Sequence, residues 1–224
     1  KGNKMEFLIP YLPEFLRGLL LTVEVTLSGV LLGLALGILL AIGDLYGGKV
    51  ISNIIRLYVE FFRGSPIIIQ LFIFYFTIPD LLHLPIERVT VGFMVFALNS
   101  AAYQKGYIKG AMEAVFEDQM TAALSIGLSK AKAIFYVILP QALRLVIPAW
   151  GNEFCSLTKS TSALLVIGVE DLTAIGKNLV GITYRNLEIY SFVAIIYLIW
   201  ISVMMKILDI VYERVKIPGI EVSA

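Results

Sequence analysis

Long apolar stretches, each of about twenty residues, recur along this chain and constrain its fold more than any other feature. The two clearest run from Leu19 to Ile42 and from Tyr190 to about Val211. An α-helix needs about 20 apolar residues to cross the hydrocarbon core of a bilayer, because each residue advances it by about 1.5 Å. Hydrophobic residues make up 58% of the 224, more than the roughly 45–50% typical of soluble domains. The sequence therefore predicts an all-α, multi-pass membrane helical bundle.

Three further segments complete a predicted bundle of about five transmembrane helices. They run from Arg56 to Pro79, from Val89 to about Gly110 and from Ala133 to about Phe154. The stretch Arg63-Gly-Ser-Pro66 interrupts the first of them, and a glycine followed closely by a proline predicts a break or kink. We expect residues 1–224 to form a single transmembrane domain, with a solvent-side helical loop at about 111–132.

Between the last two spans, the apolar run from Leu164 to Val169 is too short to cross a bilayer. A re-entrant or interfacial segment fits this run. Basic residues are modestly more frequent on the side that carries the 111–132 loop and the C-terminus. The excess of Lys and Arg on cytoplasmic loops then predicts that the C-terminus is cytoplasmic and the N-terminus is outside.

The charged and reactive residues exclude several classes of function. The net charge is only +1 and the basic residues are scattered, so a nucleic-acid interface is not expected. Cys155 and His83 are the only cysteine and histidine, so neither an internal disulfide nor a Cys/His metal cluster is predicted. No nucleophile and base stand at a useful spacing, so we expect neither a catalytic site nor a metal site.

A glycine-rich stretch after the first span resembles a phosphate-binding P-loop. Gly43 to Val50 fits G-x-x-x-x-G-K-[ST] except at its last position. A P-loop follows a strand and ends in a hydroxyl that helps to hold magnesium, whereas this stretch follows a predicted membrane helix and ends in valine. We interpret it as a turn, so any ATP hydrolysis must reside on another chain.

Glycines recur every four residues along the first span, at Gly29, Gly33 and Gly37. This spacing places them on one face of a helix, where another backbone can approach closely. Generic helix packing is the favoured interpretation, and a specific self-association motif is the alternative.

Polar residues inside the third and fourth spans are the candidates for a transport site. Glu153 lies beside Trp150 and Asn152, and ionisable groups at membrane depth usually face a water-filled path or a partner. A structural ion pair with Lys159 is the alternative for Glu153. In the third span a polar group on nearby turns either lines a pore or marks where the helix leaves the bilayer. This group comprises Asn99, Ser100, Tyr103 and Gln104.

Two stretches near the middle of the chain carry a family resemblance. Thr121-Ala-Ala-Leu-Ser-Ile-Gly127, followed by Val137-Ile-Leu-Pro140, resembles the EAA loop of ABC importer permeases. Thr121 stands where that motif has glutamate, and Asp118, Gly106 and Lys109 also differ from the usual residues. The stretches Arg63 to Pro66 with Gln70, and Asn152-Glu153 leading to Leu157–Ser162, are similar to the polar amino acid branch of the family. The resemblance covers nearly the whole chain.

The resemblance implies a type I ABC importer permease, a transport subunit and not an enzyme, in the cytoplasmic membrane. It implies a dimer of permeases, expected to be a homodimer, on two cytoplasmic ATP-binding subunits that carry ATP and magnesium. It also implies an extracytoplasmic substrate-binding protein, no cofactor in this chain and no nucleic acid. The loop contacting the ATPase subunits would include Gln119, Thr121, Ala122, Ala123, Gly127 and Leu128.

The expected cargo is a polar, basic L-amino acid such as arginine or histidine, moved by alternating access. The candidate substrate-binding residues are Glu153, Asn99, Tyr103, Gln104, Trp150, Asn152 and Ser100. The alternative is an ion-coupled secondary transporter or channel subunit. Many secondary transporters carry internal repeats with paired broken helices, and this chain shows no second copy of its 133–162 segment.

Overall fold

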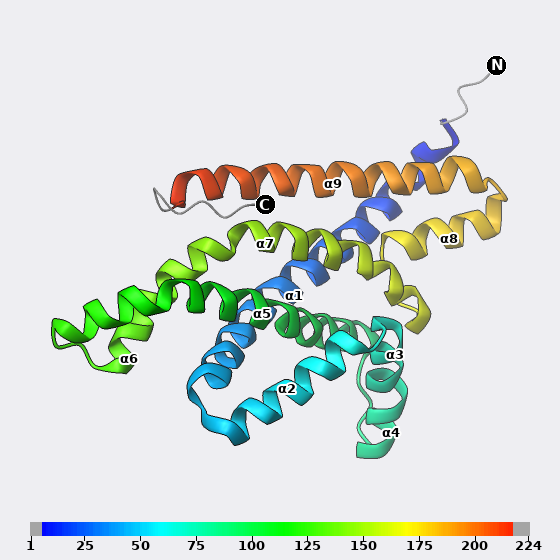
Figure 1. Ribbon diagram of the computed structural model, residues 1–224. Coiled ribbons are helices and arrows are strands. Elements are labelled where there is room, and N and C mark those ends of the chain that lie inside the picture. The colour runs from blue at the N-terminus through cyan, green and yellow to red at the C-terminus, as the bar shows by residue number, and fades with distance from the viewer. Residues whose placement is uncertain (1–5, 217–224) are drawn as a thin grey trace.

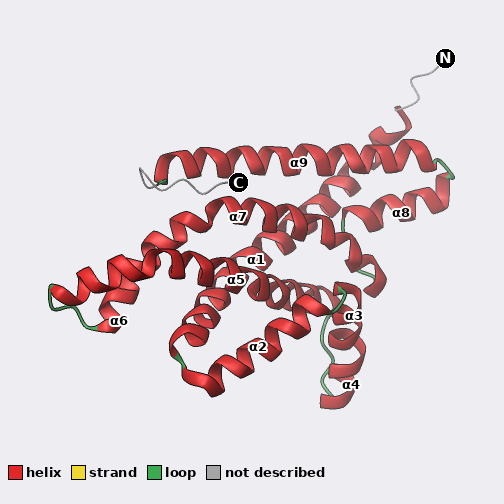
Figure 2. Cartoon of the chain, in the orientation of Figure 1, coloured by secondary structure: helices red, strands yellow, loops and turns green. Residues whose placement is uncertain are grey.

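A computed structural model describes residues 6–216, including the side chains in that range except those of 6 and 116–118. Within this range every regular element is helical (Figures 1 and 2). In chain order the elements are η1 Glu6–Tyr11, α1 Leu12–Tyr46, α2 Gly48–Gly64, α3 Ile67–Phe72, η2 Ile73–Thr77, α4 Ile78–Leu82, α5 Arg88–Ser125, α6 Lys130–Ala133, η3 Ile134–Ile138, α7 Leu139–Ser160, η4 Thr161–Ile167, α8 Leu172–Thr183 and α9 Asn186–Val215. The start of α1 and the α8–α9 turn lie at one end of the bundle, and α6 and the end of α9 lie at the other (Figure 1).

Helices α1 and α5 form the centre of the bundle, and the glycine face of α1 sets their spacing. Gly29, Gly33 and Gly37 are all buried. A β-carbon added at Gly33 would lie 2.8 Å from the side chain of Ser100, and one added at Gly37 would lie 3.1 Å from that of Gln104. Only glycine permits this close approach, so the prediction of helix packing along this face is confirmed.

The predicted second span is broken, as Gly64 and Pro66 indicate. Helix α2 ends at Gly64, and Ser65 and Pro66 are extended. The chain then resumes as Ile67–Leu82, which is bent by 109° from α2. Proline lacks the amide hydrogen that would continue the ladder of α2, and the residue before it avoids helical angles.

The predicted fourth span is one long helix with a local widening where the sequence has a proline. The span runs over Lys130–Ile167, and a π-helical turn at Ile134–Ile138 precedes Pro140, which stands in the first turn of α7. A π-turn shifts the hydrogen-bond register by one residue and so accommodates an interruption without breaking the helix.

By length and composition, three described helices can cross a membrane, and the bent pair α2 with Ile67–Leu82 would make a fourth. Helix α5, in the place of the predicted third span, is not among the three, because polar residues accumulate in it from Asn99 onward. Helix α9 is the most exposed span, with 6% of its apolar window buried inside the chain, which suits contact with lipid. The fold is therefore the all-α, multi-pass bundle that was predicted.

The segment predicted as a helical loop at about 111–132 is mostly a continuation of α5, which extends to Ser125. The chain reverses at Gly127, which has a φ of +85°, a conformation that glycine adopts without steric cost. Helix α6 begins at Lys130, after Ser129 accepts a hydrogen bond from the amide of Lys132. The turn at the end of α5 therefore projects beyond the bundle, at its α6 end (Figure 1).

A buried ionic cluster fixes the end of α1 to α5. Asp44 Oδ2 lies 2.6 Å from Lys105 Nζ and 2.8 Å from Lys109 Nζ, and the Asp44 side chain is only 8% exposed. Ser52, from α2, donates a 2.5 Å hydrogen bond to the other Asp44 oxygen. Both carboxylate oxygens are thus satisfied, as burial of a charge requires. The stretch Gly43 to Val50 is a helix-to-helix turn around this cluster, in agreement with its interpretation.

Candidate functional site

A cavity of about 230 Å³ opens where the break between α2 and α3 meets the middle of α5 and α7. Its mixture of apolar walls with a few polar groups is typical of a small-molecule site. The side chains and backbone that line it belong to Ser65, Pro66, Ile67, Asn99, Tyr103, Glu153, Ser156, Leu157 and Ser160. Three of the seven predicted substrate-binding residues, Asn99, Tyr103 and Glu153, therefore meet at one cavity.

Glu153 is held by a chain of hydrogen bonds that crosses three helices. Glu153 is 4% exposed, and its Oε1 accepts a 2.7 Å hydrogen bond from Ser100 Oγ. Ser100 in turn accepts a 3.0 Å bond from Gln104 Nε2, which also donates to the carbonyl of Val30 on α1 at 2.8 Å. Glu153 and Lys159, both described in the structure, form no ion pair. Glu153 thus lines the cavity without an ion-pair partner among the described residues.

Asn99 lines the cavity, but its amide group is engaged by the helix break. Its Nδ2 donates to the carbonyl of Phe62 at 3.1 Å and to Gln70 Oε1 at 3.0 Å. Gln70 Nε2 donates to the Phe62 carbonyl at 2.9 Å and to the Ser65 carbonyl at 3.0 Å. The break leaves carbonyls at the end of α2 without helical partners, and these two amides satisfy them. Asn99 and Gln70 therefore shape one wall of the cavity.

Tyr103, which also lines the cavity, contacts a cationic side chain from the helix break. The guanidinium of Arg63, at the end of α2, lies 5.1 Å from the centre of the Tyr103 ring, within the range of a cation–π contact. Arg63 also lies next to Gly106, since a β-carbon at that glycine would meet Arg63 Nη1 at 3.8 Å, an ordinary van der Waals distance. The departure from the family motif at Gly106 is thus compatible with the position of Arg63.

The remaining predicted substrate-binding residues lie outside the lining. Ser100 and Gln104 are completely buried and act behind Glu153. Trp150 is half-buried against the apolar cluster between α5 and α7, and its Nε1 has no hydrogen-bond partner in the described chain. Asn152 is exposed, because adjacent helical residues differ by about 100° in direction. A role for Trp150 or Asn152 in substrate binding remains a prediction.

Sequence reasoning missed several residues that shape this region. Gln70 was noted only as part of the family resemblance, although its amide closes the helix break. Ser156 and Ser160 were not singled out, yet both line the cavity and also a neighbouring groove of about 490 Å³. Ser156 follows Glu153 by three residues, and Ser160 follows Ser156 by four. This spacing places all three side chains on nearby turns of one helix face, and it is the signal that could have identified the two serines.

The predicted coupling residues cluster at the α6 end, but they do not all face outward. Thr121, Ala122 and Gly127 are exposed, Leu128 is half-buried, and Ala123 is 3% exposed in the core of the bundle. Gln119 accepts a long, 3.4 Å hydrogen bond from Gln141 of α7. Leu124 and Ile126, which lie within the predicted loop but were not singled out, are 48% and 79% exposed at the tip. Both apolar side chains therefore lie at the surface of the projecting turn.

A broken helix, a buried carboxylate and a cavity at the middle of an apolar bundle define the class of membrane transport protein. Residues 33–217 match the family described as the binding-protein-dependent transport system inner membrane component. The chain belongs to this family. It is therefore a multi-pass cell-membrane permease subunit, not an enzyme, and works with ATP-binding subunits and a substrate-binding protein.

Curated relatives of similar length transport amino acids. The glutamine transport system permease protein GlnP of Escherichia coli (strain K12) is 34% identical over 93% of this chain and 95% of its own length. The arginine transport system permease protein ArtQ of Bacillus subtilis (strain 168) is 31% identical over 93% and 95%. The L-cystine transport system permease protein TcyL of the same organism is 32% identical over 88% and 85%.

Solved structures share the fold. A chain in the crystal structure of an amino acid ABC transporter with histidines superposes with a TM-score of 0.85 at 32% identity, over 96% of this chain and 100% of that one. A chain of the inward facing methionine ABC transporter MetNI superposes with a TM-score of 0.75 at 18% identity, over 97% and 100%, which shows the fold alone. The protein is thus an amino acid ABC importer permease subunit.

Proposed function

We propose that this permease imports a polar L-amino acid that carries a positive charge, with arginine and histidine as the leading candidates. The observation that supports this substrate is Glu153, which is the only charged side chain among the described residues that line the cavity. A buried carboxylate in a low-dielectric path favours a cationic partner and disfavours an anionic one. Ser156 and Ser160 supply hydroxyl groups at the same wall.

The names of the relatives support an amino acid as the substrate, but they do not determine the charge of its side chain. Their names include glutamine, arginine and cystine permeases, so neutral and cationic cargoes both occur in proteins of about 31–34% identity. Glu153 can pair either with the α-ammonium group that every amino acid carries or with a cationic side chain. In the proposed function, Glu153 pairs with a cationic side chain of the substrate.

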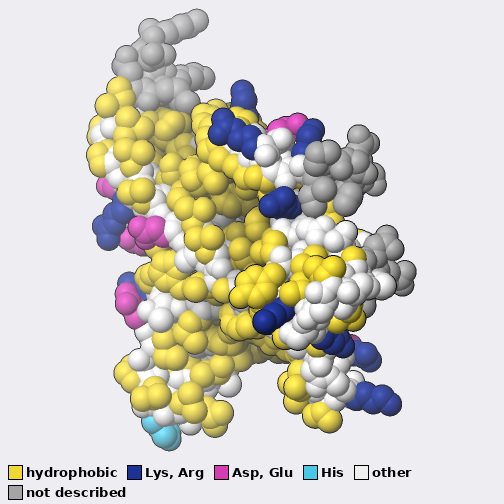
Figure 3. Space-filling model, turned by 90° about the vertical axis from the view of Figure 1, so that its left-hand side faces the viewer, with side chains coloured by type: hydrophobic (Ala, Val, Ile, Leu, Met, Phe, Trp, Pro, Cys, Tyr) yellow, Lys and Arg dark blue, Asp and Glu magenta, His cyan; other side chains and the backbone are white. Residues whose placement is uncertain are grey.

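The proposed assembly is a homodimer of this permease on two cytoplasmic ATPase subunits, with the N-terminus outside. Among the described side chains, the face of the molecule at the α6 end shows more Lys and Arg than Asp and Glu (Figure 3), which supports a cytoplasmic location for that end. The turn after α5, with Leu124 and Ile126 exposed, would contact an ATPase subunit. ATP and magnesium would bind there and not to this chain. Alternating access then follows from differences in these contacts between nucleotide states.

Substitution of Glu153 by glutamine tests the substrate. The neutral amide retains the size of the side chain but cannot pair with a cation, so uptake of labelled L-arginine into proteoliposomes should fall by at least about tenfold, the effect of losing a charge-assisted bond. Glu213→Gln, at an exposed site on α9, is the matched control and should leave uptake unchanged. Equal uptake by the Glu153→Gln transporter would refute the proposed site. A loss of arginine and glutamine uptake to the same degree would assign Glu153 to the α-ammonium group.

A further inference from the structure

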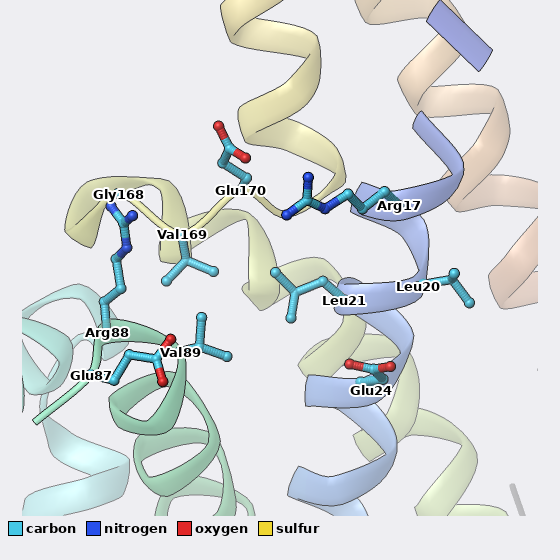
Figure 4. A pocket seen from close by; sticks show the side chains of 10 residues that line it. All are labelled: Arg17, Leu20, Leu21, Glu24, Glu87, Arg88, Val89, Gly168, Val169 and Glu170. Atoms are coloured by element: carbon cyan, nitrogen blue, oxygen red, sulfur yellow. The ribbon is translucent and has the colours of Figure 1, made fainter. Parts of the chain in front are cut away.

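A second pocket lies at the N-terminal end of the bundle, far from the α6 turn. It has a volume of about 440 Å³ and is formed by the first part of α1, the start of α5 and the loop between η4 and α8. Figure 4 shows the ten lining side chains, which are Arg17, Leu20, Leu21, Glu24, Glu87, Arg88, Val89, Gly168, Val169 and Glu170. The volume lies within the range of small-molecule sites.

The five charged side chains of this outer pocket are not neutralised by one another. Two are arginines and three are glutamates, and all five are exposed. None forms an ion pair or hydrogen bond with any described residue. Charges of both signs that converge on one concavity without pairing are available to a ligand that carries both signs.

The five charged side chains lie at two depths in the outer pocket. Glu24 follows Arg17 by seven residues on α1, which places it about 10 Å further along the helix axis. Figure 4 shows the carboxylates of Glu24 and Glu87 beside Leu21 and Val89, whereas Arg17, Arg88 and Glu170 lie nearer to the N-terminal end of α1. The pocket thus has an acidic inner level and a mainly basic outer level.

An apolar layer separates this pocket from the Glu153 cavity. Val169 lines the outer pocket, Leu157 lines the inner cavity, and both belong to one buried cluster with Val91, Val95 and Leu164. The two pockets are thus lined in part by members of the same apolar cluster.

We propose that the outer pocket is a second, low-affinity site for an extended basic amino acid, with the side-chain cation at the inner carboxylates of Glu24 and Glu87 and the α-carboxylate at the outer guanidinium groups of Arg17 and Arg88. This inference rests on the proposed transport function and adds a step to it. Exposed ion pairs contribute little each, because water and salt screen them. A weak site suits transfer, since a solute must leave it to move on.

The test is equilibrium binding of labelled L-arginine, and separately of L-glutamine, to the permease–ATPase complex in lipid nanodiscs without binding protein. The wild-type complex should bind two molecules per permease chain, one of them weakly. In a Glu153→Gln background the weak site should remain, and adding Glu24→Gln with Glu87→Gln should weaken it by about fivefold. Lys177→Gln, at an exposed site on α8, is the matched control and should change nothing. Arg88→Lys, which keeps the charge, should retain most of the binding.

One bound molecule per wild-type chain, lost in Glu153→Gln, would overturn the outer site and leave the proposed function intact. Two molecules in the Glu153→Gln complex, with the weak one lost in the glutamate double variant, would overturn the role of Glu153 and support the outer site. Unchanged binding by the double variant, together with a loss of ATPase stimulation by the binding protein, would make the pocket a protein-docking surface and overturn the proposal. Thermal unfolding of each complex checks that the variants are folded.

Discussion

Ser100 Oγ donates a 2.7 Å hydrogen bond to Glu153 Oε1, and this bond joins the middle of α5 to the middle of α7. The single hydroxyl proton of Ser100 is donated to the carboxylate, while the hydroxyl oxygen accepts a hydrogen bond from Gln104 Nε2. The direction of the Glu153 side chain is thus determined by two residues that do not line the cavity. Recognition at this site depends on helix packing as well as on the lining itself.

Ser100→Ala should weaken recognition of substrate without unfolding the protein. The Glu153 carboxylate would lose its donor, and a hydrogen bond to a charged group is worth about 1.5–3 kcal/mol. We expect KM for uptake to rise by about tenfold or more, with a smaller change in the maximal rate. Ser28→Ala is the control, because Ser28 bonds only to backbone carbonyls of its own helix. An unchanged KM would show that Ser100 does not act on the site.

Gly33→Ala should separate α1 from α5. The new methyl group would lie 2.8 Å from Ser100 and 3.0 Å from Gln104 Nε2, so the helices must move apart. Overpacking of this kind costs about 1–3 kcal/mol, which would appear in the free energy of unfolding measured by detergent titration. Gly181→Ala is the control, since no atom lies within 4 Å of a β-carbon there, and it should stabilise α8 by about 0.5–1 kcal/mol. Equal stabilities for both variants would contradict the close packing at Gly33.

Local features of the sequence predicted much of this fold. The glycine spacing gave the packed face of α1, and the Gly64–Pro66 stretch gave the break after α2. The number of spans was harder to predict, because the polar residues of α5 lower its hydropathy although the helix lies at the centre of the bundle. Burial in protein instead of lipid is a tertiary property that composition does not report.

The candidate site was predictable where a residue was chemically out of place. Glu153 and Asn99 stand out in apolar surroundings, and both line the cavity. Asn152 stands out equally, yet it faces away, because the direction of a helical side chain depends on which face the neighbours cover. Gln70 could not be assigned its role, since its partner Asn99 lies 29 residues away in the sequence.

Gln70→Leu should distort the helix break and the cavity wall. The Ser65 carbonyl would lose its 3.0 Å bond to Gln70 Nε2, and the buried Phe62 carbonyl would keep only Asn99. An unsatisfied buried group costs about 1–3 kcal/mol, so both stability and substrate affinity should fall. Ser65→Ala, which removes one acceptor and leaves the two backbone ones, should cost about 1 kcal/mol or less. A larger loss in Ser65→Ala than in Gln70→Leu would place the support of the break elsewhere.

Asp44→Asn should destabilise the junction of α1, α2 and α5 more than any exposed charge substitution. Lys105 and Lys109 would lose the carboxylate that each contacts within 2.8 Å, and the Lys105 side chain, only 13% exposed, would keep its positive charge in a poorly hydrated site. Removing one partner of a buried ion pair costs about 3–5 kcal/mol, and the residual exposure of Lys109 places the expected loss near the lower figure.

Glu213→Gln is the control, because its ion pair with Lys216 is exposed and is worth at most about 1 kcal/mol. Detergent titration of both variants measures the difference, and a loss in Asp44→Asn no greater than in the control would mean that the cluster contributes nothing to the junction. Because α5 continues from Lys109 to the turn at Gly127, the same variant should also reduce ATPase stimulation by substrate if this junction transmits motion between the cavity and the coupling turn.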